Sequence, residues 1–181
     1  MEFLRVGDVS WGSPDRAAYL FDGLAITVQQ WCEQASDGNE SGVRVEIQHL
    51  TQSVPTNAKT EFAAKVFHIA TPIWRADIFM LGSGVPGNFD RAHYHPRFNG
   101  VEPCDREWDV SLTASPFEWL REKLWRMDAI VVSAGFSELE GSSDVSRIGR
   151  RSAAIVLTAE ELMREVRAVA PNFLPSSSVG A

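Results

Sequence analysis

Two histidines separated by one residue are the feature of this sequence that most readily suggests chemistry. They lie in the segment His93-Tyr94-His95. In a β-strand the side chains alternate between the two faces, so His93 and His95 would project from one face together with Arg97. The spacing therefore predicts two imidazoles side by side on one surface of a sheet.

A second pair of polar residues lies one segment earlier. In Trp74-Arg75-Ala76-Asp77-Ile78, charged and apolar residues alternate, so Arg75 and Asp77 share a face. The glycine-rich stretch over 82–88 is typical of a loop, and we expect it to join the two segments as a hairpin. If the register places like faces together, Arg75 and Asp77 lie beside the histidines and Arg97.

This set of side chains fits two chemistries. His93, His95 and Asp77 match a three-ligand site for a divalent metal such as Fe, Zn, Ni or Mn, with open positions left for a substrate. Without a metal, His93 or His95 would act as a general acid or base and Asp77 would orient it. The same three residues are therefore the catalytic candidates and the metal-ligand candidates.

Arginines and the segment after the histidines supply the remaining candidates. Arg75, Arg97 and Arg106 are candidate substrate-binding residues, because guanidinium groups bind phosphate and carboxylate in a bidentate manner. Glu102 or Cys104 is a candidate for a further metal ligand, although the preferred interpretation of Cys104 is a small buried apolar residue.

These residues support one functional hypothesis and leave an alternative open. The hypothesis is hydrolytic or phosphodiester chemistry on a small anion or a short RNA, with or without a metal. In the alternative, the polar alternation is the solvated face of an ordinary antiparallel sheet, and the protein is a non-enzymatic binding or interaction module.

Two resemblances bear on these hypotheses. The segment from Gly87 to His95, a glycine followed after five residues by His-x-His, resembles the first half of the first cupin motif, which implies a metal-binding β-fold. The positions of that motif's glutamate hold Asn99 and Gly100, and no histidine follows His95. The Arg-x-Asp segment with its His-Tyr-His-Pro core also resembles small uncharacterised bacterial proteins, some of them encoded near toxin–antitoxin loci, which favours RNA as a substrate.

Composition and charge limit the class of protein. The chain has 181 residues, 44% of them hydrophobic and 23% charged, with a net charge of -7, as expected of one globular domain. This acidity excludes a broad nucleic-acid track but allows a local basic pocket. Cys32 and Cys104 are too few for a disulfide framework. The sequence shows neither a secretory signal nor an apolar run of about 20 residues, so we expect a cytoplasmic protein without a membrane partner.

The elements that must position the candidate residues change from strands to helices along the chain. Extended segments are expected over 3–9, 24–31, 43–50 and 65–81, with a hairpin loop over 36–42, a break at Pro72, and either a short helix or an irregular crossing over 56–64. A capping box at Ser115 predicts a helix over 116–134 that ends at Gly135, and a second capping box at Thr158 predicts a helix to about Val169 that Pro171 ends.

Together these patterns predict an α+β fold: a curved antiparallel sheet of about five to seven strands covered by two C-terminal helices. We expect one domain over 1–170 and a flexible tail over 171–181. Trp119 and Trp125 lie beside the apolar stripe of the first helix, so they are expected to pack on the sheet or to form a homodimer surface.

Overall fold

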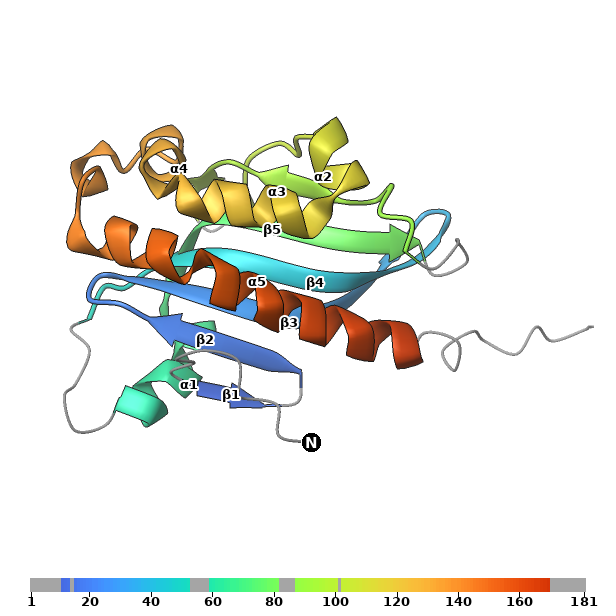
Figure 1. The fold of residues 1–181 in the computed structure, drawn as a ribbon, viewed down its shortest axis with the longest axis horizontal. Coiled ribbons are helices and arrows are strands. Elements are labelled where there is room, and N and C mark those ends of the chain that lie inside the picture. The colour runs from blue at the N-terminus through green and yellow to red at the C-terminus, as the bar shows by residue number, and fades with distance from the viewer. Residues whose placement is uncertain (1–10, 14, 53–58, 82–86, 101, 170–181) are drawn as a thin grey trace, which may run out of the picture.

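The protein is described here by a computed structural model that places residues 11–13, 15–52, 59–81, 87–100 and 102–169. Strands precede most of the helices along the chain (Figure 1). In chain order the elements are β1 (Trp11–Ser13), β2 (Arg16–Leu20), β3 (Leu24–Ala35), β4 (Gly38–His49), α1 (Lys59–Ile69), β5 (Thr71–Leu81), β6 (His93–His95), β7 (Phe98–Asn99), β8 (Glu102–Pro103), α2 (Val110–Ala114), α3 (Pro116–Trp125), α4 (Met127–Ser133), the 3-10 turn η1 (Ser137–Leu139) and α5 (Ser143–Val169).

The main sheet is an antiparallel meander in which each strand pairs with the next one along the chain. Its strand order is β1-β2-β3-β4-β5-β6, and β7 and β8 form a separate two-stranded sheet. The predicted α+β fold and the predicted strand number are therefore confirmed. The main sheet is open, with β1 and β6 at its edges among the described strands, and this arrangement differs from the double-sheet jelly roll of cupins.

The long β3–β4 hairpin corrects the predicted loop over 36–42. Ala35 pairs with Gly38, so only Ser36 and Asp37 form the turn, and most of the predicted loop continues β4. Gly42 lies inside this strand because β4 and β5 approach closely there: a Cβ atom added to Gly42 would lie 2.0 Å from the carbonyl oxygen of Ile78. Gly42 therefore marks a close strand contact rather than a loop.

One face of the sheet is covered by α3, α4 and α5 (Figure 1). Alternate residues of the strands pack there against apolar helix residues, as in the stack of Trp74 on Trp119, whose ring centroids are 6.0 Å apart. The prediction that Trp119 packs on the sheet is confirmed. Trp125 is 65% exposed and does not join the core.

The predicted helix over 116–134 is present but divided. It starts at Pro116, as predicted, although Ser115 makes no side-chain capping hydrogen bond, and it breaks at Arg126, whose ψ of 46° is not helical. The chain changes direction at the break, and Met127 continues the row of buried apolar residues. Apolar residues keep their helical spacing on both sides of Arg126, so the hydrophobic periodicity of the sequence does not indicate the break. Gly135, at a φ of +92°, follows the end of α4.

The last helix begins 15 residues before its predicted start, at Ser143 rather than Thr158. The carboxylate of Asp144 accepts hydrogen bonds from the backbone N–H groups of Asp22, Gly23 and Leu24, which fixes the start of α5 to the β2–β3 turn. Thr158 lies inside the helix, where its hydroxyl group contacts the Tyr19 hydroxyl at 2.5 Å. The predicted capping box at Thr158 therefore does not mark the start of a helix.

The opposite face of the sheet is covered only in part by a helix. α1 packs beneath β1 and β2, where Ala63 and Val66 join Leu20, Ala25 and Leu50 in a small second core. Residues 65–69 belong to this helix, which corrects the extended segment expected there, and β5 starts after it. Toward β5 and β6 the same face carries the candidate site instead.

Some expectations lie outside the described residues. These are the strand over 3–9, the helix stop at Pro171 and the tail over 171–181. No helix in the described part of the chain combines the length and the apolar character needed to cross a bilayer.

Candidate metal site

The hairpin of β5 and β6 brings the predicted residues together. In this antiparallel pair, Arg75 lies opposite His95 and Asp77 lies opposite His93. Because paired residues share a face, four of the five polar side chains predicted to meet do so, on the side of the sheet away from α3, α4 and α5.

These side chains are buried. Asp77 is 0% exposed, His93 1% and His95 4%. The ring of Trp108 lies over His93, with ring centroids 5.3 Å apart, and the Tyr94–Glu107 bridge fastens the following segment to β6. The interpretation of this region as a solvated sheet face therefore does not hold for these three residues.

Asp77 is the centre of the cluster. Its Oδ1 accepts a hydrogen bond from Arg44 Nε at 2.7 Å, and its Oδ2 accepts one from Arg75 Nε at 3.1 Å. The Nε2 atoms of His93 and His95 lie 3.2 and 3.6 Å from the same Oδ2. Burial by itself raises the pKa of Asp77, but the two neighbouring imidazoles and the Arg44 guanidinium outweigh burial and hold that pKa well below its usual range.

Backbone carbonyls fix the orientation of both imidazoles. His93 Nδ1 lies 2.9 Å from the carbonyl oxygen of Arg91, and His95 Nδ1 lies 3.0 Å from that of Cys104. A carbonyl oxygen only accepts hydrogen bonds, so each Nδ1 must carry the proton. In the neutral ring the Nε2 atom then has the lone pair. Nε2 of His93 is directed toward Asp77, and Nε2 of His95 lies between Asp77 Oδ2 and Arg75 Nη2, 3.6 and 3.2 Å away.

The contact between His93 and Asp77 suits a shared metal ion. With a proton on Nδ1, a neutral His93 directs the lone pair of Nε2 at the carboxylate oxygen Oδ2, which is also an acceptor. A metal ion bound by both atoms would satisfy both lone pairs.

The three converging residues can hold a metal ion. One ligand atom from each of Asp77, His93 and His95 lies within 4.8 Å of the other two. Ligands about 2.1 Å from a common ion lie about 3.0 to 3.4 Å apart in octahedral or tetrahedral geometry, close to the Nε2–Oδ2 separations observed. Hydrogen bonds from Nδ1 to carbonyl oxygens are also typical of metal-binding histidines, because they orient the ring and fix Nε2 as the ligand atom.

Arg44 is a member of the cluster that sequence reasoning missed. It lies opposite Asp77 in the β4–β5 register, is 6% exposed, and packs its guanidinium against the ring of Trp31, 3.8 Å from the ring centroid. The alternation of Arg44, Glu46 and Gln48 with apolar residues was the available signal. It could be used only once β4 was known to pair with β5.

Polar residues continue across the same face from the cluster toward β3. Glu46 accepts a hydrogen bond from Gln29 Nε2 at 3.4 Å, and Gln48 donates one to Thr27 Oγ1 at 3.2 Å. Burial raises the pKa of Glu46, although the charges of Arg44 and Arg75 act in the opposite direction. Gln48 Oε1 is buried with no hydrogen-bond partner among the described residues.

The remaining candidates do not join the cluster. β6 ends at His95 because Pro96 has no N–H group for the ladder, and Arg97 leaves the face: its Nη2 lies 3.7 Å from where a Cβ atom of Gly135 would be. Arg106 is exposed on the same connecting segment. Cys104 contributes its carbonyl oxygen, and neither its thiol nor Glu102 belongs to the metal-ligand group found among the described residues.

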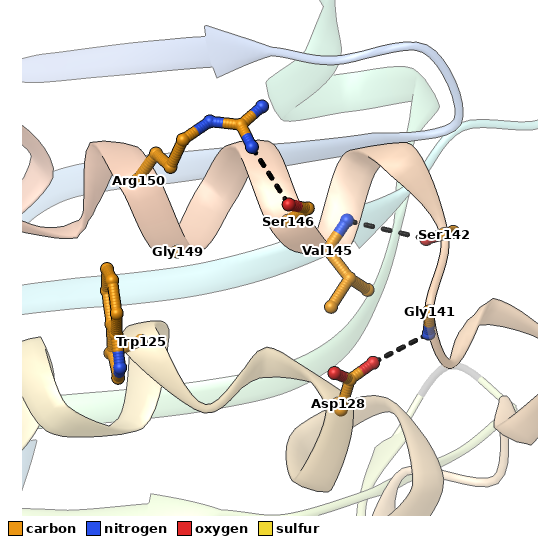
Figure 2. Close-up of a pocket in the computed structure, with 8 residues that line it drawn as sticks. All are labelled: Trp125, Asp128, Gly141, Ser142, Val145, Ser146, Gly149 and Arg150. Carbon is orange, nitrogen blue, oxygen red and sulfur yellow. Dashed lines mark hydrogen bonds between the residues drawn. The ribbon is translucent and has the colours of Figure 1, made fainter.

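A separate groove of about 420 Å³ lies between α3, α4 and the start of α5. Figure 2 shows Trp125 standing at one side of it and Arg150, hydrogen-bonded to Ser146 Oγ at 2.9 Å, on α5 at the other. Asp128 closes one end by accepting a 2.7 Å hydrogen bond from the Gly141 N–H group. A homodimer surface at Trp125 stays a prediction.

Comparison with models of known protein families, with curated proteins and with solved structures gives no match to this chain. Functional inference therefore depends on the geometry of the cluster.

Proposed function

We propose that this protein binds a divalent transition-metal ion through Asp77, His93 and His95 and uses it in hydrolysis. The observation that carries the metal site is the pair of Nδ1–carbonyl hydrogen bonds, which leave Nε2 of each ring as the ligand atom, 3.2 and 3.6 Å from Asp77 Oδ2. Two imidazoles and one carboxylate suit Fe, Zn, Ni or Mn.

We propose a phosphodiester or another small anion, including a short RNA, as the substrate class. A bound ion supplies a Lewis acid and lowers the pKa of water. Arg75 donates a hydrogen bond to Asp77, one of the proposed ligands. Arg97 and Arg106 are exposed on the segment that follows His95. Trp108 is 55% exposed beside His93, and an indole face of this kind can stack on a base. A cytoplasmic location fits thiols at Cys32 and Cys104 that are not paired with each other.

One observation favours a second candidate function. All three ligand residues are buried, and Arg44 and Arg75 fill positions beside the carboxylate. A closed site of this kind suits a non-enzymatic module whose metal supports binding or structure rather than catalysis.

Metal analysis of untagged protein tests the proposed site. After incubation with Zn²⁺, Mn²⁺, Ni²⁺ or Fe²⁺ and removal of the excess, we expect about one ion per chain for at least one metal, and loss of that ion in the variant His93→Ala/His95→Ala. The matched control is His68→Ala, which removes an exposed histidine on α1 and should keep the ion. Failure of all four metals to bind, or equal binding by the double variant, would refute the site.

Turnover assays separate the two candidate functions. The metal-loaded protein is incubated with bis(p-nitrophenyl) phosphate and with single-stranded RNA. Hydrolysis that is lost in the double variant and kept in His68→Ala supports the enzyme. Stoichiometric metal without turnover of either compound contradicts the proposed phosphodiester chemistry and favours the non-enzymatic module.

A further inference from the structure

Arg75 occupies the side of the cluster that a metal ion would need. Its Nε donates to Asp77 Oδ2 at 3.1 Å, and its Nη2 lies 3.2 Å from His95 Nε2. A guanidinium group has donors only, so His95 Nε2 accepts this hydrogen bond with its lone pair. The atoms that would bind the metal are therefore the atoms that now bind Arg75, and the two cations compete for them.

A second acidic residue lies directly across the sheet from Arg75. Glu46 on β4 is its register partner, so both side chains leave the same face of neighbouring strands. No ion pair among the described residues joins them: Arg75 pairs with Asp77, and Glu46 accepts a hydrogen bond from Gln29 Nε2 at 3.4 Å. Directly opposed Cβ atoms lie about 4.5 to 5.5 Å apart, so a change of rotamer brings the arginine to this carboxylate.

The surroundings of Glu46 favour such a move. Burial raises the pKa of this carboxyl group, and the charges of Arg44 and Arg75 only partly counter that effect. A buried carboxylate is stabilised by a directly bonded guanidinium, which matches its two oxygens. A divalent ion at Asp77 would also repel Arg75 and leave Arg44 as the remaining arginine on that carboxylate.

We propose that Glu46 is the alternate partner of Arg75: the guanidinium group pairs with Asp77 and His95 in the metal-free protein and with Glu46 in the metal-bound protein. This inference rests on the proposed metal site and assigns Glu46 as a positioning residue for it. Metal affinity then depends on the competition between two carboxylates for one arginine.

A double-mutant cycle on zinc affinity tests the exchange. Untagged protein is titrated with Zn²⁺ in the unaltered form and as Arg75→Gln, Glu46→Gln and the double variant. We expect Arg75→Gln to bind zinc about tenfold more tightly, because the competing cation is gone, and Glu46→Gln about tenfold more weakly, because the arginine has no alternate partner. In the Arg75→Gln background, the Glu46→Gln change should have little further effect.

Two controls separate this role from a general effect of charge or folding. Glu40 lies on the same face of β4 but pairs with Arg91, so Glu40→Gln should leave zinc affinity unchanged. Glu46→Asp keeps the carboxylate and should restore part of the lost affinity. In the ¹H–¹⁵N NMR spectrum, the Arg75 Nε signal should shift on zinc addition in the unaltered protein and shift less in Glu46→Gln.

The outcomes distinguish this inference from the proposed function. If the unaltered protein binds no zinc or other metal, both are overturned. If it binds zinc and Arg75→Gln binds it no more tightly, or if Glu46→Gln weakens binding equally in both backgrounds, the exchange is overturned and the metal site stands.

Discussion

The two faces of this sheet both contain buried side chains but are built differently. Most buried strand residues on the face under α3, α4 and α5 are apolar, and the stack of Trp74 on Trp119 is typical of their contacts. On the other face, Arg44, Asp77 and His93 are just as buried, yet each has a polar partner. Stability on the first face depends on close packing of apolar side chains. On the second face it depends on every charged and polar group having a partner.

The largest expected effect comes from breaking that network at its centre. Asp77→Asn removes the buried charge with which Arg44 and Arg75 both pair, and we expect it to lower the free energy of unfolding by about 3 to 5 kcal/mol. Urea unfolding of the two proteins measures the difference. The control is Arg44→Met/Asp77→Leu, which removes the Arg44–Asp77 pair and should destabilise less than Asp77→Asn. A loss below about 1 kcal/mol for Asp77→Asn would show that the two faces do not differ in this way.

A cavity on the helix-covered face should have a similar effect on stability and none on the site. Leu124 on α3 is 0% exposed, and Leu124→Ala should lower the free energy of unfolding by about 3 kcal/mol. Because this residue lies across the sheet from the cluster, the number of metal ions bound per folded chain should stay the same. Loss of the metal in this variant would mean that the two faces are coupled through the sheet.

Close approach of the strands is the next feature to test. Gly42→Ala would place a Cβ atom 2.0 Å from Ile78 O, so β4 and β5 must move apart near Arg44 and Asp77. We expect a loss of about 1 to 3 kcal/mol and weaker metal binding. Gly149→Ala in α5 is the opposite case, because its Cβ would lie at an ordinary 3.5 Å from its nearest atom, the carbonyl oxygen of Trp125 on α3. That change should stabilise the protein by about 0.5 to 1 kcal/mol, and urea unfolding of both variants measures the two effects.

The smallest effect is expected where the polar face is incomplete. Gln48 Oε1 has no partner in the described part of the chain, so Gln48→Leu removes an unsatisfied acceptor while it breaks the hydrogen bond to Thr27. These changes oppose each other, and the free energy of unfolding should stay within about 1 kcal/mol of the original value. A loss of several kcal/mol would instead indicate an ordered water that completes the network at Gln48.

The sequence was sufficient to predict the hairpin and its shared face. Alternation around Asp77 and around His93 is local, and a glycine-rich loop between two such segments leaves few ways to pair them. Arg44 and Glu46 were not found because their part in the cluster depends on the β4–β5 register, which joins segments separated by α1. The burial of these polar side chains could not be predicted either. A buried row and a solvent-exposed row of polar residues alternate with apolar residues in the same way.

Among the helices, local signals were reliable where they mark an end and unreliable where tertiary contacts decide. Pro116 and Gly135 bound the α3–α4 region as predicted. The start of α5 depends on Asp144, whose carboxylate binds backbone groups more than a hundred residues earlier in the chain, at Gly23 and Leu24. No local sequence pattern predicts that contact.

Imidazole NMR tests the central claim most directly. Long-range ¹H–¹⁵N spectra of the full chain would be recorded before and after addition of one equivalent of Zn²⁺. We expect His93 and His95 both to carry their proton on Nδ1 in the zinc-bound protein. Both Nε2 resonances should move to the range of metal-bound nitrogen while those of His68 are unchanged. Spectra in which the Nε2 resonances of His93 and His95 do not respond to zinc would contradict the claim.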